Sequence, residues 1–395
     1  MWDWIVRNRL AAAAFLVAAV YYPGILSGAY SPRWWVVAIA LPIASDLDPR
    51  IIYRPVLVLL LGGLAWAAMS LLVTPDPQGA ALDLLFLALL TLTAIAAAGI
   101  DDIAPVIVAF GWGVSISCVL AIPQSFGWSA INQILGPAGT FMNSEVLAEL
   151  AAPLLAWCIF KKRWALASMM AIPLVLCHSR IAILAAAVGL LVGWRASALI
   201  KSALAAALVL VAIGSVSMVG IDKASSGLTR MVLWISGIDS IVPLGRGLGW
   251  WAFVHPASFQ ELAHSDALQM MVELGIGSVF FLAIPVVIIL RRRGSDSAEH
   301  AISAAFLFEF VVSFPLHFPA SGFLVAMLAG HMAGSRTCLR GRESIRGIVL
   351  FPDVPRGDSF AGGVAGGLGG RAEDVSFRPP SPQHCALNSK AGGRF

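Results

Sequence analysis

The stretch ALDLLFLALLTLTAIAAAGI, residues 81–100, decides the fold class of this chain. Asp83 is its only charged residue, and an apolar run of about 20 residues is long enough to cross a bilayer as a helix. The polar turn TPDPQG (74–79) precedes it, and another apolar run, 104–122, follows it. This alternation of long apolar runs and short polar turns is typical of a polytopic membrane protein.

The same pattern extends along the chain, which is 59% hydrophobic and only 12% charged. A soluble domain carries about 25% charged residues, so a water-soluble fold is excluded. The sequence predicts an all-α polytopic integral membrane protein. Its twelve transmembrane helices are expected near 10–26, 32–45, 55–73, 81–100, 104–122, 145–160, 164–178, 180–194, 198–219, 266–290, 299–315 and 319–334.

Positive residues orient the predicted helices, because cytoplasmic loops are enriched in Lys and Arg. With the N-terminus in the cytoplasm, the inner loops carry twelve such residues and the outer loops carry five. The inner set is Arg7, Arg9, Arg50, Arg54, Lys161, Lys162, Arg163, Arg195, Lys201, Arg291, Arg292 and Arg293, and the outer set is Arg33, Arg180, Lys223, Arg230 and Arg246. Both termini are therefore predicted to be cytoplasmic.

Two further segments define the domain organisation. Residues 1–334 form the membrane-embedded bundle, and the long loop 220–265, between predicted helices 9 and 10, faces outward. Long loops inside a compact fold are usually functional. The tail, 335–395, contains AGGVAGGLGG (361–370) and few large apolar residues, so we expect it to be disordered in the cytoplasm. The net charge of +4 arises in this tail and gives no case for nucleic-acid binding.

Two outer arginines are candidate functional residues. Arg180 lies at the outer end of the predicted eighth helix in CHSRIAIL, where a snorkelling interfacial arginine is the alternative interpretation. Arg230 lies in SSGLTRMVLWISGI, four residues before Trp234, and a surface helix with an Arg–Trp contact is its alternative.

A third outer arginine, Arg246, lies in PLGRGLGWW. The segment lacks the Lys-Ser/Thr pair of a phosphate-binding P-loop, so it predicts no nucleotide site. A tight turn that places Trp250 and Trp251 at the membrane interface is the simpler interpretation.

His264 lies in ELAHSDALQMMVELGIG, where the long loop returns to the membrane, and Ser265 or Asp266 is expected to cap the helix. The positive end of a helix dipole favours a neutral imidazole, which acts as a base. Asp266, Gln269 and Glu273 follow on one helix face, and such a polar stripe is expected to face the protein interior or a water-filled cavity. An inert interfacial histidine is the alternative.

Acidic pairs and cysteines give no evidence for a metal site. Asp46 and Asp48, and also Asp101 and Asp102, fall on the predicted cytoplasmic side, where a role at helix ends is favoured. The five cysteines are scattered without a CxxC pair, so neither a disulfide scaffold nor a zinc module is predicted. We expect no metal and no cofactor.

Five segments in order resemble one family. They are GPAGTFMNSEVLAELAAPLL (136–155), SRIAILAAAVGLLVG (179–193), TRMVLWISGI with VPLGRGLGWWAF (229–253), HSDALQMMVELGIG (264–277) and FPLHFPASGFLVAMLAG (314–330). Together they resemble the bacterial O-antigen ligase and polysaccharide polymerase superfamily over about residues 80–334. His264, Ser265 and Gly275 match the ligase pattern, whereas Ser278 departs from its last position.

The resemblance implies a GT-C-like membrane glycosyltransferase of the bacterial inner membrane with a periplasmic active site. Its donor would be a glycan linked to undecaprenyl diphosphate, and no metal would be needed. The family's essential arginines correspond to Arg180 and Arg230 and its essential histidine to His264, with Arg246 as a further diphosphate-binding residue. Ser265, Asp266 and Trp234 would support these residues.

Three functions stay open at this point. The leading one is an O-antigen ligase, which transfers the glycan to a lipid A-core sugar in lipopolysaccharide biosynthesis. A polymerase that extends lipid-linked repeats is the close alternative. A membrane transporter of glycan or lipid is the alternative from another class, although the sequence shows no paired broken helices.

The topology is directly testable. Reporters fused after Lys162 or Arg293 should be cytoplasmic, and reporters inserted within 220–260 should be periplasmic, because the positive residues define the inner loops. Paired alkaline phosphatase and green fluorescent protein fusions measure both states. A cytoplasmic signal from 220–260 would place the candidate residues on the wrong side and contradict the functional assignment.

Overall fold

The computed structural model describes residues 9–21, 31–44, 49, 52–128, 136–141, 143–194, 221–254, 264–291, 296–313 and 315–334. These residues are mostly helical, and none of them belongs to a β-strand. By length and composition, three helical segments are suited to crossing a membrane: Pro77–Ala97, Ala104–Ser125 and Asp266–Ile288. The all-helical fold class is confirmed, whereas the twelve spans and their orientation stay predictions.

Eleven of the twelve predicted apolar segments coincide with helices. Outside the interrupted 266–290 segment these are α2 (Arg9–Ala19), α3 (Ser31–Ala44), α4 (Arg54–Ser70), α5 (Pro77–Ala97), α6 (Ala104–Ser125), α7 (Ser144–Phe160), α8 (Trp164–Leu176), α9 (Arg180–Gly193), α15 (Ser297–Val312) and α16 (Pro319–Ala333). Proline in the first turn of α4, α5, α6 and α16 favours those starting points. The predicted ninth helix, 198–219, and the tail, 335–395, lie outside the described residues.

The predicted 266–290 segment is helical and apolar enough to cross a membrane over Asp266–Ile288, but a 3₁₀ turn interrupts it. It contains α13 (Asp266–Leu274), a 3₁₀ turn η2 (Gly275–Gly277) and α14 (Ser278–Arg291). Gly275 has φ +56°, and a Cβ there would lie 2.4 Å from the carbonyl oxygen of Pro243. A glycine is needed because the chain turns through the left-handed region against another backbone segment.

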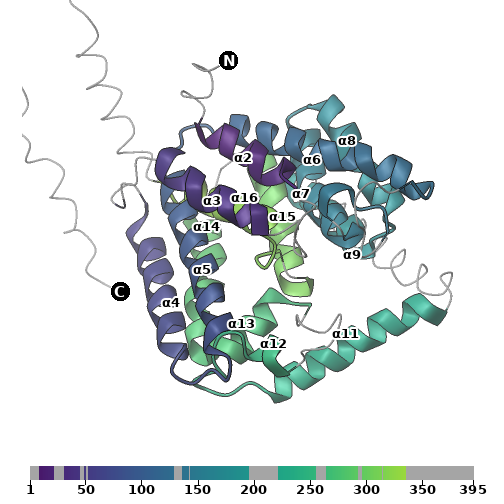
Figure 1. Ribbon diagram of the computed structural model, residues 1–395. Coiled ribbons are helices and arrows are strands. Elements are labelled where there is room, and N and C mark those ends of the chain that lie inside the picture. The colour runs from purple at the N-terminus through teal and green to yellow at the C-terminus, as the bar shows by residue number, and fades with distance from the viewer. Residues whose placement is uncertain are drawn as a thin grey trace, which may run out of the picture. The chain divides into compact units, whose positions relative to one another are not determined.

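The described part of the long 220–265 segment is largely helical. It contains α11 (Ile221–Asp239) and the short α12 (Trp250–Val254). Both helices contact α13, and Figure 1 shows the three together on the lower side of the bundle.

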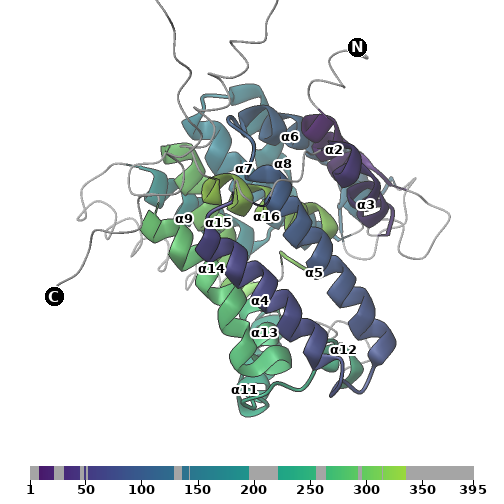
Figure 2. The same cartoon turned by 90° about the vertical axis from the view of Figure 1, so that its left-hand side faces the viewer.

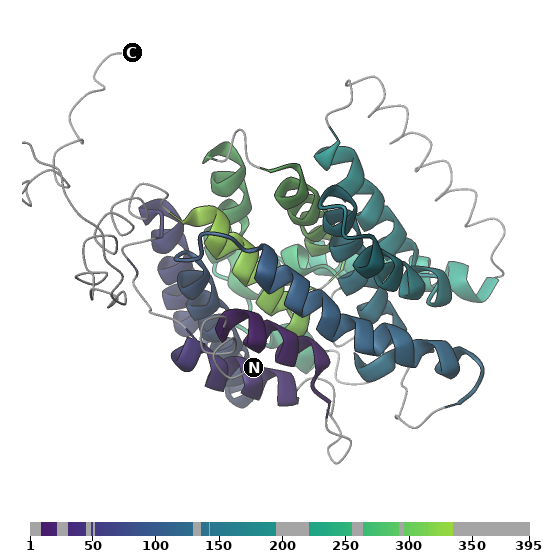
Figure 3. The same ribbon diagram turned by 90° about the horizontal axis from the view of Figure 1, so that it is seen from above.

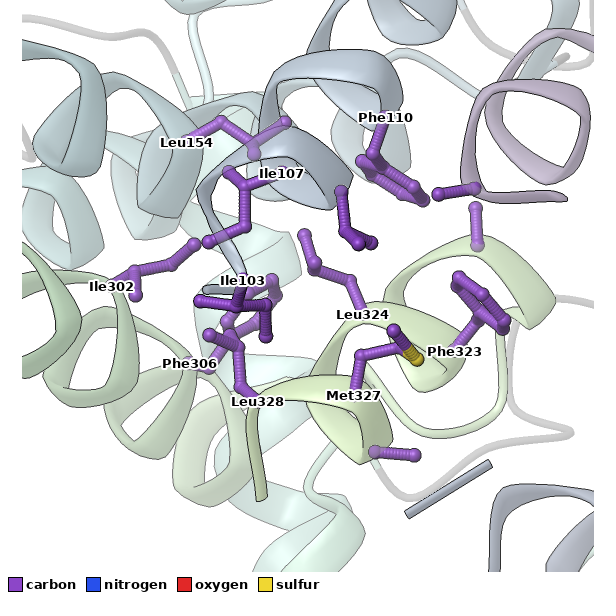
Figure 4. Close-up of a cluster of buried hydrophobic side chains, with 14 of the residues drawn as sticks. Ile103, Ile107, Phe110, Leu154, Ile302, Phe306, Phe323, Leu324, Met327 and Leu328 are labelled. Atoms are coloured by element: carbon purple, nitrogen blue, oxygen red, sulfur yellow. The ribbon is translucent and has the colours of Figure 1, made fainter. Parts of the chain in front are cut away.

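The main hydrophobic core lies between α6, α7, α15 and α16 (Figure 4). Phe110 of α6, Leu154 of α7, Phe306 of α15 and Phe323 of α16 are all buried there. Around this core, α2 packs against α6, a pair seen from above in Figure 3, and α4 packs along α14 (Figure 2).

Small residues bring α7, α9 and α15 close together. A buried cluster joins Ala148, Ala152, Ala182, Ala185, Ala186 and Ala305. A Cβ at Gly189 of α9 would lie 2.7 Å from the carbonyl oxygen of Ala301 in α15. In a lipid bilayer the hydrophobic effect does not drive helices together, so membrane helices depend on such close van der Waals packing. The three helices therefore form a tight unit.

Arg33, predicted to lie in an outer loop, is instead fully buried in α3. Its guanidinium donates to the carbonyl oxygens of Val17 and Ala18, at the end of α2, and to the Thr140 hydroxyl at 2.9 Å. It also lies 4.0 Å from the centre of the Phe141 ring. A cation at the carbonyl end of a helix is favourable, so Arg33 joins α2, α3 and the 136–141 segment.

Contacts between helix ends join segments that the sequence places on the same side of the membrane. On the predicted inner side, Lys161 pairs with Asp296, and His331 bonds to the carbonyl oxygen of Ile100 at 2.9 Å. On the predicted outer side, the Thr74 hydroxyl donates to the carbonyl oxygen of Leu248 at 2.7 Å. The bundle thus has two distinct ends, although the membrane face to which each belongs stays a prediction.

Gly330 provides a test of the packing. A Cβ there would lie 1.9 Å from the carbonyl oxygen of Ala94. This oxygen belongs to the backbone of α5, which cannot rotate away as a side chain can. We expect Gly330→Ala to lower the thermal unfolding midpoint in detergent. Gly62→Ala is the matched control, because its nearest neighbour is the ring of Phe280, which can rotate away. Both changes favour helix by about 0.5–1 kcal/mol, so equal midpoints would contradict the packing at Gly330.

Candidate functional site

Four helix ends converge at the predicted outer side of the bundle. Ala148 and Ala182, near the starts of α7 and α9, share one buried cluster. Gly193 lies against the carbonyl oxygen of Ser297, so α9 and α15 run antiparallel and the end of α15 reaches the start of α9. The backbone N–H of Asp266, the first residue of α13, donates to the carbonyl oxygen of Ser313 at 2.8 Å. The starts of α7, α9 and α13 therefore lie around the end of α15.

Each of the three helix starts has a side-chain cap. Asn143, Ser179 and Ser265 accept hydrogen bonds from the backbone N–H groups of Glu145, Ala182 and Leu268, respectively. Asn and Ser are favoured at this position because their short side chains reach a free N–H group. The capping role predicted for Ser265 is confirmed. Three positive dipole ends at one place favour a bound anion.

Two of these starts share an unusual backbone conformation. His178 and His264 have φ values of +52° and +53°, and each directly precedes a capping serine. A left-handed conformation is uncommon outside glycine and costs about 1–3 kcal/mol. Such strain often occurs at functional sites, and His264 is the histidine that the sequence selects.

Arg230 of α11 pairs with Glu145 in the first turn of α7. Its Nη2 donates to Oε2 of Glu145 at 2.9 Å. Trp234, one turn further, packs with Leu233, Trp251 and Leu268, which holds α11 against α13. Within the part of the chain that the structure describes, this is the only hydrogen bond of the Arg230 guanidinium, so its other N–H groups are available.

Arg180 is the first residue of α9 and is partly buried. Its Nη2 atom is buried and has no hydrogen-bond partner among the described residues. A buried donor without an acceptor is costly, and more so when it is charged. An anionic ligand at this helix start would provide the missing acceptor.

Two carboxyl groups near these arginines, those of Glu145 and Glu149, already have donors. Besides Glu145, Glu149 of α7 accepts a hydrogen bond from the Ser313 hydroxyl at 2.6 Å and interacts electrostatically with Arg230 and Asp266. The side chains of Glu149 and Ser313 are both buried. Glu145 is therefore ion-paired with Arg230, whereas no carboxyl group among the described residues bonds to Nη2 of Arg180.

Asp266 holds a second histidine, His317, in the connection between α15 and α16. Asp266 is fully buried, and its Oδ1 lies 2.5 Å from Nδ1 of His317. Its Oδ2 accepts from the backbone N–H of Leu316 at 2.7 Å. Burial lowers the pKa of His317, but Asp266, with smaller effects of Asp83 and Glu273, outweighs it and raises the pKa to about 9.

The predicted polar stripe on α13 is confirmed to face the protein interior, because Asp266, Gln269 and Glu273 are all buried. Of the acidic pairs, Asp102 accepts from the backbone N–H of Ala104 at the start of α6, which confirms its predicted role at a helix end. Asp46 and Asp48 lie outside the described residues.

Arg246 lies apart from the other two arginines. Its backbone N–H bonds to the carbonyl oxygen of Val272, near the far end of α13, and its guanidinium lies 5.6 Å from the centre of the Trp250 ring. No contact joins it to Arg180 or Arg230 within the described ranges. The tight turn is confirmed. The Trp251 side chain is fully buried against α11 and α13, and the position of Trp250 and Trp251 at the membrane interface stays a prediction.

The sequence interpretation missed Glu145, Ser313 and His317, and it assigned no role in this site to Glu149. The two glutamates lie one turn apart in NSEVLAEL, and an ionisable pair in an apolar segment is a usable signal. His317 stands between two prolines in FPLHFP, outside the predicted helices. Nothing local indicates its pairing with Asp266, which lies 51 residues away.

Comparisons with known proteins add no assignment. No family model matches the sequence, and no curated protein matches it significantly.

Ser313 provides a test of the site's internal bonding. Ser313→Ala removes the hydroxyl donor of the buried Glu149 and should cost about 1–3 kcal/mol of stability. Thermal unfolding in detergent measures the effect. Ser303→Ala is the matched control in α15, because that hydroxyl donates only to the weak sulfur acceptor of Met332. A midpoint for Ser313→Ala equal to that of the control would contradict the Ser313–Glu149 bond.

Proposed function

We propose that this protein is a metal-independent, inverting glycosyltransferase of the bacterial inner membrane. It transfers a glycan from undecaprenyl diphosphate to a sugar hydroxyl at the periplasmic face, in the manner of an O-antigen ligase with a lipid A-core acceptor. The observation that carries the proposal is the buried Nη2 of Arg180, which has no acceptor among the described residues. It lies at a site where three helix N-termini meet, one of them paired with Arg230 through Glu145.

The chemistry of the donor explains why such a site is suitable. The acceptor oxygen attacks the anomeric carbon, the bond from that carbon to the phosphate oxygen breaks, and the electron pair leaves with the diphosphate. Negative charge develops on this leaving group, and fixed cations and helix dipoles stabilise it. Arginine is well suited, because its planar fork binds phosphate oxygens with two hydrogen bonds.

His264 is the proposed general base. It directly precedes the cap of α13, two residues before the buried Asp266. In this role it accepts the proton of the acceptor hydroxyl as the new glycosidic bond forms. The Arg230–Glu145 pair orients one guanidinium, while Arg180 is free to bind the diphosphate.

A polymerase remains the close alternative, because it would use the same donor site with a lipid-linked acceptor. The lipopolysaccharide of a deletion strain distinguishes the two. Loss of all O-chain with accumulation of lipid-linked polymer indicates a ligase, whereas core carrying one repeat indicates a polymerase.

A transporter is the alternative from another class, and one observation favours it. Glu309 is buried in α15 near Glu149, and its Oε1 has no partner among the described residues. Buried carboxylates in membrane helices often belong to ion pathways. Glycan transfer by the purified protein without a gradient would favour the enzyme.

Side-by-side measurement of donor binding and turnover tests the proposal. Arg180→Ala should weaken binding of the lipid-linked donor about 10-fold to 100-fold, and Arg230→Lys should weaken it less, because the charge is kept while the fork is lost. His264→Ala should bind the donor but turn over about 10²–10⁴-fold more slowly.

Arg163→Ala is the matched control, since this exposed arginine lies on the predicted inner side at the start of α8. Protein in lipid nanodiscs allows both quantities to be measured with the same sample. Normal turnover by folded His264→Ala would show that another group is the base.

A further inference from the structure

The connection between α15 and α16 contacts the start of α13, and hydrogen bonds to Asp266 hold His317 at that place. Both oxygens of Asp266 are used, one by Nδ1 of His317 at 2.5 Å and one by the backbone N–H of Leu316 at 2.7 Å. The backbone N–H of Asp266 is bonded to Ser313 in the same connection. Three bonds from one buried residue therefore determine the position of the imidazole ring.

The ring presents its other nitrogen outward. In a protonated imidazole both nitrogens are donors, so Nδ1 then donates to Oδ1 of Asp266. Nε2 has no hydrogen-bond partner among the described residues, and 28% of the His317 side chain is exposed, against none of Asp266. This is an arrangement in which a buried carboxylate orients a histidine whose second nitrogen contacts another molecule.

The charge of the ring follows from its surroundings. Asp266 and Glu273 of α13 and Asp83 of α5 are the acidic groups that act on it. They keep the ring protonated at neutral pH, because its pKa is raised to about 9. At pH 7 Nε2 is therefore an N–H donor that carries positive charge, and it is not a base.

His317 belongs to the same end of the bundle as the arginines. Ser313, four residues before it, donates to Glu149, and Glu149 lies one helical turn from Glu145, the partner of Arg230. His317, bonded to the first residue of α13, therefore lies at the same group of helix starts as Arg180 and Arg230.

We propose that His317, oriented by Asp266, is a third cationic contact for the diphosphate of the lipid-linked donor, with Nε2–H donating to a phosphate oxygen. This inference rests on the proposed function. As the bond to the anomeric carbon breaks, the growing negative charge on the leaving diphosphate strengthens this hydrogen bond. His317 thus has a role distinct from that of His264, which takes the proton of the acceptor.

Two substitutions separate the nitrogens of the ring. The amide nitrogen of His317→Asn can occupy the place of Nδ1 and keep the bond to Asp266, but nothing replaces Nε2. His317→Gln can place an uncharged donor near Nε2 and loses the bond to Asp266. The probe is undecaprenyl diphosphate in nanodiscs, with undecaprenol as the uncharged control, and thermal unfolding verifies the fold of each variant.

The affinity of the wild type for undecaprenyl diphosphate should fall as pH rises through about 9, where the imidazolium loses its proton. His317→Asn should bind about 10-fold to 100-fold more weakly at pH 7, with no fall near pH 9. Asp266→Asn should shift this loss of affinity to lower pH, toward the ordinary histidine pKa of about 6.5. Binding of undecaprenol should not change in any variant.

The outcomes distinguish this inference from the proposed function. If the wild type does not bind undecaprenyl diphosphate, or if Arg180→Ala and Arg230→Ala bind it normally, both fail. If the arginine variants weaken binding while folded His317→Asn binds like the wild type, only the role of His317 fails. A wild-type affinity that is constant between pH 7 and pH 10 also contradicts that role, even if the variants do not fold.

Discussion

The hydrogen bond between the Asp266 backbone N–H and the Ser313 carbonyl oxygen is the contact on which the site depends. It attaches the start of α13 to the end of α15, and α15 is already packed tightly against α7 and α9. The side chains of the same two residues extend the connection, from Asp266 to His317 and from Ser313 to Glu149. One junction therefore positions residues from four helices and one connecting segment.

That junction is possible because small side chains let the helices approach. Alanines form the buried contact of α7, α9 and α15, and glycines at 189 and 193 lie directly against backbone atoms of α15. In lipid, such contacts supply the packing energy that apolar burial supplies in water. Larger residues would separate the helix starts, and with them Arg180 from the Arg230–Glu145 pair.

The electrostatic character of the site follows from which groups are already paired. Glu145 accepts from Arg230, Asp266 from His317 and Glu149 from the uncharged Ser313 hydroxyl, so each of these carboxyl groups has a donor. Arg180 and the outer nitrogen of His317 are donors without protein acceptors among the described residues, and three helix N-termini add partial positive charge. A site of this kind favours an anion with several oxygen atoms, and a diphosphate is such an anion.

Much of this protein is determined locally and is visible in the sequence. Apolar runs predict eleven of the described helical segments, and Ser265 caps α13 as expected, because hydropathy and capping depend on a few adjacent residues. The sequence also selects Arg180, Arg230 and His264 as candidates. Only the tertiary structure decides that Arg230 pairs with Glu145, that Arg246 lies apart near Trp250, and that Asp266 holds His317. These pairings join residues up to 85 positions apart, and they arise from the packing of whole helices, which local sequence patterns do not specify.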